Sequence, residues 1–330
     1  PWWYVWLALL LVLAFSITMV SCRPSPRVYR VGVLSGLAFV APAVDGFKSR
    51  MAELGYVEGQ NIQYDVQSAN VDVAAYRRIL QQFVNDRVDL IFVFPTEATM
   101  EAKAATQGAN IPVVFCFALV EDTGVVKSIR EPGANITGVR YPTPEVMLKR
   151  LELMRRIAPH ARRILLPYWR NYPTVPSQLK VLYPAAEAEG VTLIEAPVEG
   201  AAELEGVLQS HQLADGSLDI DAILLMVDPV SVMPETFLAA ARFADQHRIP
   251  IGGAPMEVEN YRPLFGLTID PYTSGRLAAP LADKILSGTP AGTIPVVSPE
   301  PYMQINYRLA LELGLTVPES LLAEADEIIR

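Results

Sequence analysis

Several short runs of the chain are almost entirely apolar, and this pattern constrains the fold more than any other feature. The runs Asp89–Phe94 (DLIFVF), Ile111–Phe117 and Ala222–Val227 (AILLMV) do not alternate with polar residues. Strands of this kind are covered on both faces, which is typical of parallel sheets with helices on either side. Amphipathic helical stretches separate the runs, as parallel crossover connections require. The sequence therefore predicts an α/β protein with doubly wound parallel sheets.

The strand–helix pattern occurs twice. The first array begins with a strand at Val28–Leu34, and the pattern restarts after Asn135-Ile136-Thr137-Gly138 with a helix at Glu145–Ala158. A chain of 330 residues is too long for one compact core, so we expect two lobes. The last expected unit consists of strand Gly266–Ile269, helix Thr273–Leu286 and strand Ile294–Val297, with a helix at Asn306–Leu313 after it.

The N-terminal segment indicates export. Residues Trp2–Val20 form an apolar run without a charge, followed by Ser21-Cys22 and then by the short tether 23–27. Three interpretations stay open: a lipoprotein signal over 1–22 with an acylated Cys22, a plain secretory signal, or a retained anchor helix. Each interpretation exports the rest of the chain to the periplasm or the cell surface.

Composition excludes several classes of protein. A net charge of -9 argues against a nucleic-acid-binding protein, which needs a basic face. Two Cys and three His, none close together, exclude zinc ribbons, iron–sulfur clusters and disulfide scaffolds, and Cys116 is expected as a buried small hydrophobe. The sequence has no dinucleotide fingerprint, Walker A motif, nucleophile elbow or zincin motif. We therefore expect no catalysis, no metal and no cofactor.

Candidate ligand-binding residues lie at the carboxyl ends of the predicted strands, where open α/β sheets bind ligands. Because they come from both arrays, a cleft between the lobes could gather them. They are Ser35, Gly36, Phe39, Thr96, Glu97, Ala98, Phe117, Tyr168, Trp169, Asn171, Asp228, Met256 and Asp270.

Each main candidate has two interpretations. Thr96 opens a predicted helix, so its hydroxyl and the free N–H groups of the first turn could hold a carboxylate, or Thr96 could be only an N-cap. Asp228, with Asp270 as a second carboxylate, could pair with an ammonium group, or Asp228 could simply form the turn before Pro229. Phe39 and Phe117 could pack against a ligand or belong to the core.

Four stretches resemble a known family, the bacterial ABC transporter substrate-binding lipoproteins that include tryptophan- and tyrosine-binding members. The stretches are LGYVEGQNI at 54–62, PGANITGV at 132–139, ADKILSG at 282–288, and the segment from Ile305-Asn306 to Leu313-Gly314-Leu315-Thr316-Val317-Pro318. The resemblance implies a type 1 periplasmic-binding-protein fold whose chain crosses three times between the lobes. The lobes implied are 28–139 plus 264–290 and 140–263 plus 291–330.

The resemblance also implies a function. We expect the extracytoplasmic solute-binding component of an ABC importer, which captures a small polar solute by hinge closure. Amino acids, aromatic ones included, are the candidate solutes, and the expected partner is an ABC permease in the inner or cytoplasmic membrane. Two alternatives stay open: a ligand-sensing module for a membrane signalling partner, which a retained N-terminal helix would favour, and an exported α/β hydrolase.

Overall fold

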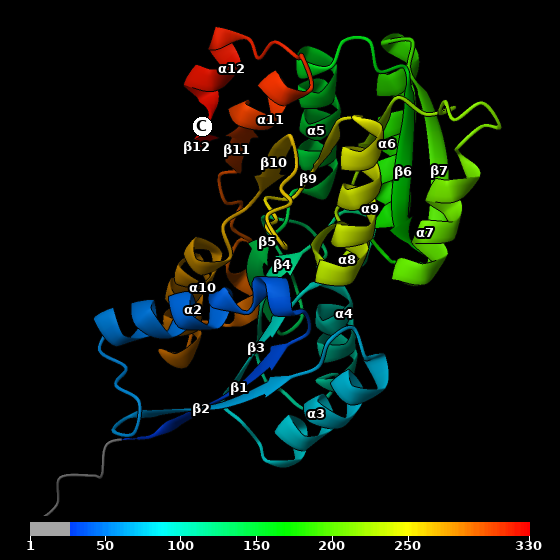
Figure 1. Ribbon diagram of the computed structural model, residues 1–330. Coiled ribbons are helices and arrows are strands. Elements are labelled where there is room, and N and C mark those ends of the chain that lie inside the picture. The colour runs from blue at the N-terminus through cyan, green and yellow to red at the C-terminus, as the bar shows by residue number, and fades with distance from the viewer. Residues whose placement is uncertain (1–26) are drawn as a thin grey trace, which may run out of the picture.

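The computed structural model describes residues 27–330, and their strands form two separate sheets (Figure 1). The first sheet has five parallel strands in the order β2-β1-β3-β4-β5. They are β1 (Tyr29–Ser35), β2 (Ile62–Ser68), β3 (Leu90–Phe94), β4 (Val113–Ala118) and β5 (Ile136–Arg140). The predicted parallel α/β fold is confirmed.

The second sheet has seven strands in the order β12-β11-β10-β9-β8-β6-β7. Only the β10–β11 pair in it is antiparallel. Its strands are β6 (Arg163–Trp169), β7 (Thr192–Val198), β8 (Ala222–Leu224), β9 (Ile251–Gly253), β10 (Phe265–Thr268), β11 (Tyr302–Asn306) and β12 (Glu327–Ile329).

Helices cover both faces of the first sheet, which explains why β3 is apolar at every position. Phe92 stacks on Phe47 of α2 at a ring-centroid distance of 4.3 Å, whereas its neighbour Ile91 packs in another cluster with Leu80 of α3. We call this sheet and its helices the five-stranded unit. The helices are α2 (Pro42–Glu53), α3 (Val73–Asn85), α4 (Thr96–Ala105) and α10 (Pro271–Leu286), with the short 3-10 helix η1 (Ala38–Val40) after β1.

The second sheet and its helices form the seven-stranded unit. Its helices are α5 (Thr143–Ile157), α6 (Val175–Ala188), α7 (Ala201–Ser210), α8 (Pro229–Val232), α9 (Pro234–His247), α11 (Tyr307–Glu312) and α12 (Glu319–Glu324). In Figure 1 this unit occupies the upper half and the five-stranded unit the lower half.

Two glycines let α10, which comes late in the sequence, pack closely against α2. A Cβ atom at Gly46 would lie 1.9 Å from the carbonyl oxygen of Tyr272, and one at Gly275 would lie 2.0 Å from that of Ala43. Only glycine permits backbones to approach this closely. Helix α10 therefore packs in the five-stranded unit, although the preceding element β10 belongs to the seven-stranded sheet.

The chain passes between the units at places that differ from those expected. Strand β10 pairs with β9 and β11, so the segment 264–290 is divided, with its strand in the seven-stranded unit and α10 in the five-stranded unit. The predicted strand Ile294–Val297 is wrong, because the segment makes only an isolated bridge from Val297 to Val139. This segment and the 3-10 helix η2 (Ala291–Thr293) lie beside β5, and the chain enters the second sheet only at β11.

Three further expectations concern single segments. Cys116 is fully buried in β4, as expected for a small hydrophobe. Over residues 27–330, no helix combines the length and the hydrophobicity needed to cross a membrane. The proposed signal over 1–22, its Cys22 and most of the tether 23–27 lie outside the described residues.

Candidate functional site

A cavity lies between the two units, at the ends of strands from both sheets. The space between its walls, open solvent at the mouth included, is about 480 Å³. The five-stranded unit and the segment just after β5 contribute Leu37, Phe39, Val40, Pro95, Thr96, Phe117 and Tyr141 to its walls. The seven-stranded unit contributes Thr143, Arg150, Tyr172, Thr174, Met226, Val227, Asp228, Ser231, Val232, Ala254 and Thr268.

Asp228 is the acidic side chain in the lining of this cavity. It follows β8 and is 6% exposed, and its Oδ2 accepts a hydrogen bond from the backbone N–H of Trp169. Its Oδ1 has no hydrogen-bond partner. Burial raises the pKa of the carboxyl from 3.8 to about 7, although backbone N–H groups and the charge of Arg150 oppose the shift. The site therefore holds a buried carboxyl group with one oxygen that has no hydrogen-bond partner.

Ser231 also lines the cavity with an unused polar atom. It lies on α8 with Asp228 directly before the helix, is 1% exposed, and its buried Oγ has no partner. An unpaired polar group inside a protein costs about 1–3 kcal/mol, so such groups are rare unless something else satisfies them. Two such atoms, one on the residue before α8 and one on the helix, lie in one cavity wall and indicate a place for a hydrogen-bonding ligand.

Arg150 of α5 is the cationic side chain of the lining, and the sequence analysis did not identify it. The residue is 1% exposed, and its Nε and Nη2 donate to the carbonyl of Leu267 at 3.1 and 2.7 Å. Its Nη1 donates to the carbonyl of Leu225 at 2.9 Å. Burial lowers the pKa of this guanidinium, and the charge of Asp228 counteracts that effect. A signal was present in the sequence, because Arg150 shares the buried face of its helix with Met147 and Met154.

The five-stranded unit forms the apolar side of the cavity. Phe117 has a left-handed backbone with φ of 53°, and its ring lies 5.3 Å from the ring of Tyr141. Phe39 lies on η1 and is half-buried. Thr96 lines the cavity as the first residue of α4, but its Oγ1 accepts a hydrogen bond from Leu119 N at 3.0 Å. The Thr96 hydroxyl thus ties α4 to the loop after β4.

A buried hydrogen-bond chain joins the two units beside the cavity. Glu97 of α4 accepts a bond from Tyr172 of the seven-stranded unit at 2.7 Å and one from Tyr76 of α3 at 3.3 Å. Glu97 is 8% exposed, and burial raises the pKa of its carboxyl. The Tyr172–Glu97 bond is therefore a direct polar contact across the boundary between the units.

Four of the thirteen candidates from the sequence line the cavity: Phe39, Thr96, Phe117 and Asp228. Ser35 and Gly36 precede the lining residue Leu37 in the chain, and Glu97 and Ala98 follow Thr96, but none of the four lines the cavity. Tyr76 donates to the carbonyl of Gly36 at 2.7 Å. Sequence position at a strand end brought these residues near the site but could not determine which of them would reach it.

The other candidates serve elsewhere. Tyr168 donates to Glu195, Trp169 contributes its backbone N–H to Asp228, and Asn171 occupies a turn with φ of 58°. Met256 lines a separate hollow, on the surface beside Arg262.

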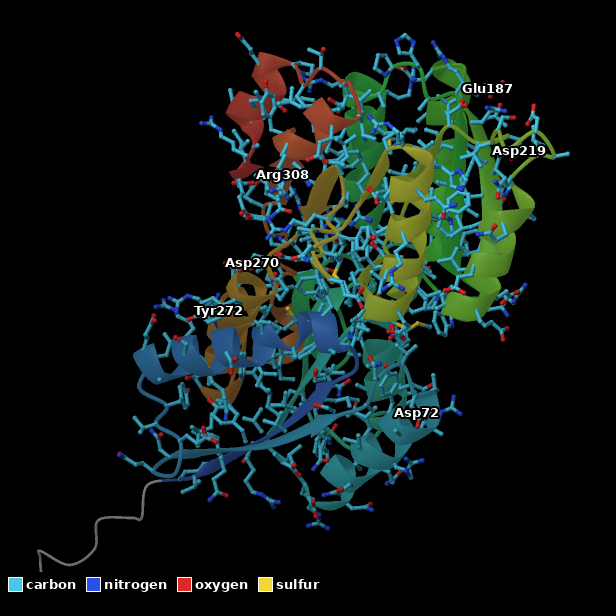
Figure 2. All side chains as sticks on the ribbon, viewed as in Figure 1. Asp72, Glu187, Asp219, Asp270, Tyr272 and Arg308 are labelled. Carbon is cyan, nitrogen blue, oxygen red and sulfur yellow. The ribbon has the colours of Figure 1, made fainter. Side chains whose placement is uncertain are left out.

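Asp270 is a helix cap. It accepts a hydrogen bond from Thr273 N at 2.6 Å, at the start of α10, and it does not line the cavity. Figure 2 shows it where the two units meet, near Tyr272.

Within residues 27–330, no group of three or more His, Cys, Asp or Glu side chains is placed to hold a metal ion.

Comparison of the sequence with known proteins shows similarity to one family. The sequence model of the family described as "ABC transporter substrate binding protein" matches residues 33–329. A tyrosine-binding protein from Clostridioides difficile (strain R20291) is 28% identical over 261 residues, which cover 78% of this chain and 71% of that protein.

Two solved structures have a similar fold. A conserved domain protein from Vibrio cholerae O1 biovar El Tor is 25% identical, with a TM-score of 0.79 over 92% of this chain and 100% of that chain. An ABC domain from Streptococcus pneumoniae, solved in complex with L-Trp, is 23% identical, with a TM-score of 0.80 over the same shares of the two chains.

Proposed function

Since the chain belongs to the ABC transporter substrate-binding protein family, we propose that the cavity between its two units captures an amino acid for an ABC importer. Members of this family are extracytoplasmic solute-binding proteins rather than enzymes, and this chain is the solute-binding component of its transporter. Closure of the two units over the solute would present a loaded receptor to a permease in the membrane.

The unpaired Oδ1 of Asp228 carries the proposal. An ammonium group is a strong donor to a carboxylate, and a buried carboxylate oxygen without a partner is destabilising until a donor reaches it. A bound amino group would satisfy Oδ1 and keep Asp228 ionised.

The apolar wall supports an aromatic amino acid. Phe39, Phe117 and Tyr141 line the cavity, and aromatic rings pack well against another ring. The relatives named for tyrosine and for L-Trp favour the same class of solute.

A thermal-unfolding screen of the purified full chain in detergent, with each of the common L-amino acids, tests this proposal. L-tyrosine or L-tryptophan should raise the melting temperature, because a ligand that binds only the folded state stabilises it. Asp228→Asn should abolish the rise, whereas the control Asp270→Asn, which alters a helix cap outside the cavity, should keep it. A wild-type melting temperature that no amino acid changes would overturn the proposal.

We also propose that the protein is tethered to the membrane through a lipidated Cys22, with 23–27 as the tether. The apolar run before Ser21-Cys22 supports this anchoring. Cys22→Ala should move the protein from the membrane fraction to the soluble fraction, because one acyl-modified residue would be its membrane attachment. Complete retention in the membrane fraction would instead favour an uncleaved anchor helix.

A further inference from the structure

The cavity contains two buried charges of opposite sign that do not pair with each other. Arg150 and Asp228 both line it, yet their hydrogen bonds go to backbone groups, and no ion pair joins them within residues 27–330. Buried charges in proteins are nearly always paired, because isolated ones are strongly destabilising. Each charge is therefore available to a group that enters the cavity.

The hydrogen bonds of Arg150 leave part of its guanidinium unused. Five N–H groups are available, and two carbonyl oxygens, those of Leu225 and Leu267, accept three bonds from them. A fourth contact, from Nη1 to the sulfur of Met147, is long at 4.0 Å. In the part of the chain that the structure describes, one N–H of Nη2 has no acceptor, and the acceptors that are present carry no formal charge.

We infer that Arg150 is a specificity-determining residue that receives the carboxylate of the bound solute, while Asp228 and Ser231 receive its amino group. This inference rests on the proposed function and deepens it, because it restricts the solute to amino acids with a free carboxylate. It places the anionic group at α5 rather than at the expected Thr96, because the guanidinium N–H groups of Arg150 are charge-assisted donors to a carboxylate and a hydroxyl is not.

Arg150 also has a structural role that the test must separate from recognition. Its two carbonyl partners lie on β10 and directly after β8, the strands on either side of β9, so the side chain ties this part of the sheet together. A substitution could weaken the fold without any bearing on the solute. The primary test therefore uses the unaltered protein and varies the solute.

The first experiment measures the affinity of the full chain in detergent for L-tyrosine, L-tyrosinamide and tyramine by titration calorimetry, with L-tryptophan and tryptamine as a second pair. The amide and the amines keep the amino group but lack the carboxylate, and we expect them to bind about 100-fold more weakly, as for loss of a buried charged partner. Equal affinities would overturn the role of Arg150 and leave amino-acid capture intact. Absence of binding by both amino acids would overturn the proposed function and this inference with it.

The second experiment compares Arg150→Lys with Arg155→Lys. Arg155 lies on the same helix and also donates to backbone carbonyls, those of Pro159 and Ala161, but it does not line the cavity. Arg150→Lys should weaken L-tyrosine binding by about 10- to 100-fold and leave tyramine binding unchanged, because lysine loses the planar fork that fits a carboxylate. Arg155→Lys should alter neither.

Two outcomes of the second experiment would contradict the inference. An equal loss for tyrosine and tyramine would show a purely structural role for Arg150, and unchanged tyrosine binding would show no role in recognition. Should Arg150→Lys fail to fold, the solute series on the unaltered protein decides alone.

Discussion

The two walls of the cavity differ in chemistry. The seven-stranded unit contributes Arg150, Asp228 and Ser231, which carry the charges and the unpaired polar atoms. The five-stranded unit contributes mainly apolar and aromatic surface, and its Thr96 already has a backbone partner. This difference indicates a division of work, in which the seven-stranded unit recognises the charged groups of a solute and the five-stranded unit covers its body.

The buried contact between the units fits this division. Glu97 is the acidic group of the five-stranded unit beside the cavity, and two tyrosine hydroxyls already occupy it. Its hydrogen bond to Tyr172 therefore joins the units, whereas Asp228 keeps an oxygen free. Two buried carboxyl groups near one cavity thus have different roles, because both oxygens of Glu97 accept bonds within the chain, whereas Oδ1 of Asp228 accepts none.

The largest expected effect is a dependence of binding on pH that Asp228 alone causes. Burial raises the pKa of Asp228 to about 7, so lowering the pH from about 8 to about 5 protonates it and removes the acceptor of the ammonium group. Affinity for L-tyrosine should fall by about 100-fold over this range, as measured by titration calorimetry. If a similar dependence remains in Asp228→Asn, another group, with Glu97 the first candidate, is responsible, and the assigned difference between the walls is wrong.

Removal of apolar surface from the five-stranded unit should have a smaller effect. Phe39→Ala deletes a half-buried ring from the cavity wall, and the loss of its contact area should weaken L-tyrosine binding by about 10-fold. Leu311→Ala serves as the control, because Leu311 is 60% exposed on α11 and lies outside the cavity. An unchanged affinity in Phe39→Ala would show that this wall does not contact the solute.

The contact between units should matter less again. Tyr172→Phe removes the donor to Glu97 Oε2 across the boundary between the units, so bringing the units together becomes less favourable and affinity should fall by about 5-fold. Tyr76→Phe is the matched control, since it removes the other donor to Glu97 but within the same unit. Small-angle X-ray scattering should find the ligand-free Tyr172→Phe protein more open than Tyr76→Phe. Equal shapes and affinities would exclude a role in closure.

The smallest effect should come from an exposed ion pair between the units. Lys180 on α6 and Asp122 after β4 form an ion pair between the units at 3.1 Å, with both side chains about 70% exposed. Exposed pairs contribute about 0–1 kcal/mol, so Lys180→Ala should change the affinity by less than about 3-fold. A loss as large as that of Tyr172→Phe would show that surface charges, rather than the buried bond, hold the units together.

The sequence predicted the parts of the fold that depend on burial. Runs such as that of β3 became fully buried strands because helices on both faces require apolar residues at every position. Strand β5 was missed, since the turn-type residues Asn135 and Gly138 flank its β-branched pair Ile136-Thr137. In the structure Gly138 lies in the strand, and the position requires glycine because a Cβ atom there would lie 2.2 Å from the carbonyl oxygen of Phe115. A close approach of two backbones leaves no periodic signal in the sequence.

The candidate site was predicted only where a side chain lies at the carboxyl end of a predicted strand or within a few residues after it. Asp228 was found by that rule, whereas Arg150 lies within a helix and reaches the cavity through the tertiary packing of α5 against the sheet. Asp270 satisfied the rule equally well but became a helix cap. Position at a strand end therefore identifies the region of a site, and the partners that each side chain finds in the folded chain decide its role.

Thermal unfolding of the wild type and of Asp228→Asn at about pH 8, with and without L-tyrosine and L-tryptophan, tests the central claim most directly. A carboxyl whose pKa is raised on folding contributes stability below its unfolded pKa of 3.8, and this contribution is lost as the pH rises through its folded pKa of about 7. At about pH 8 the ligand-free protein therefore carries an unfavourable buried charge, which asparagine removes while it can still accept the bond from Trp169.

The variant without amino acid should thus unfold at a higher temperature than the wild type, with little difference between them near pH 4. Addition of L-tyrosine or L-tryptophan should raise the melting temperature of the wild type but not that of the variant. A variant that is less stable than the wild type at about pH 8, and that either amino acid still stabilises, would contradict the claim that Asp228 is kept unpaired for a ligand.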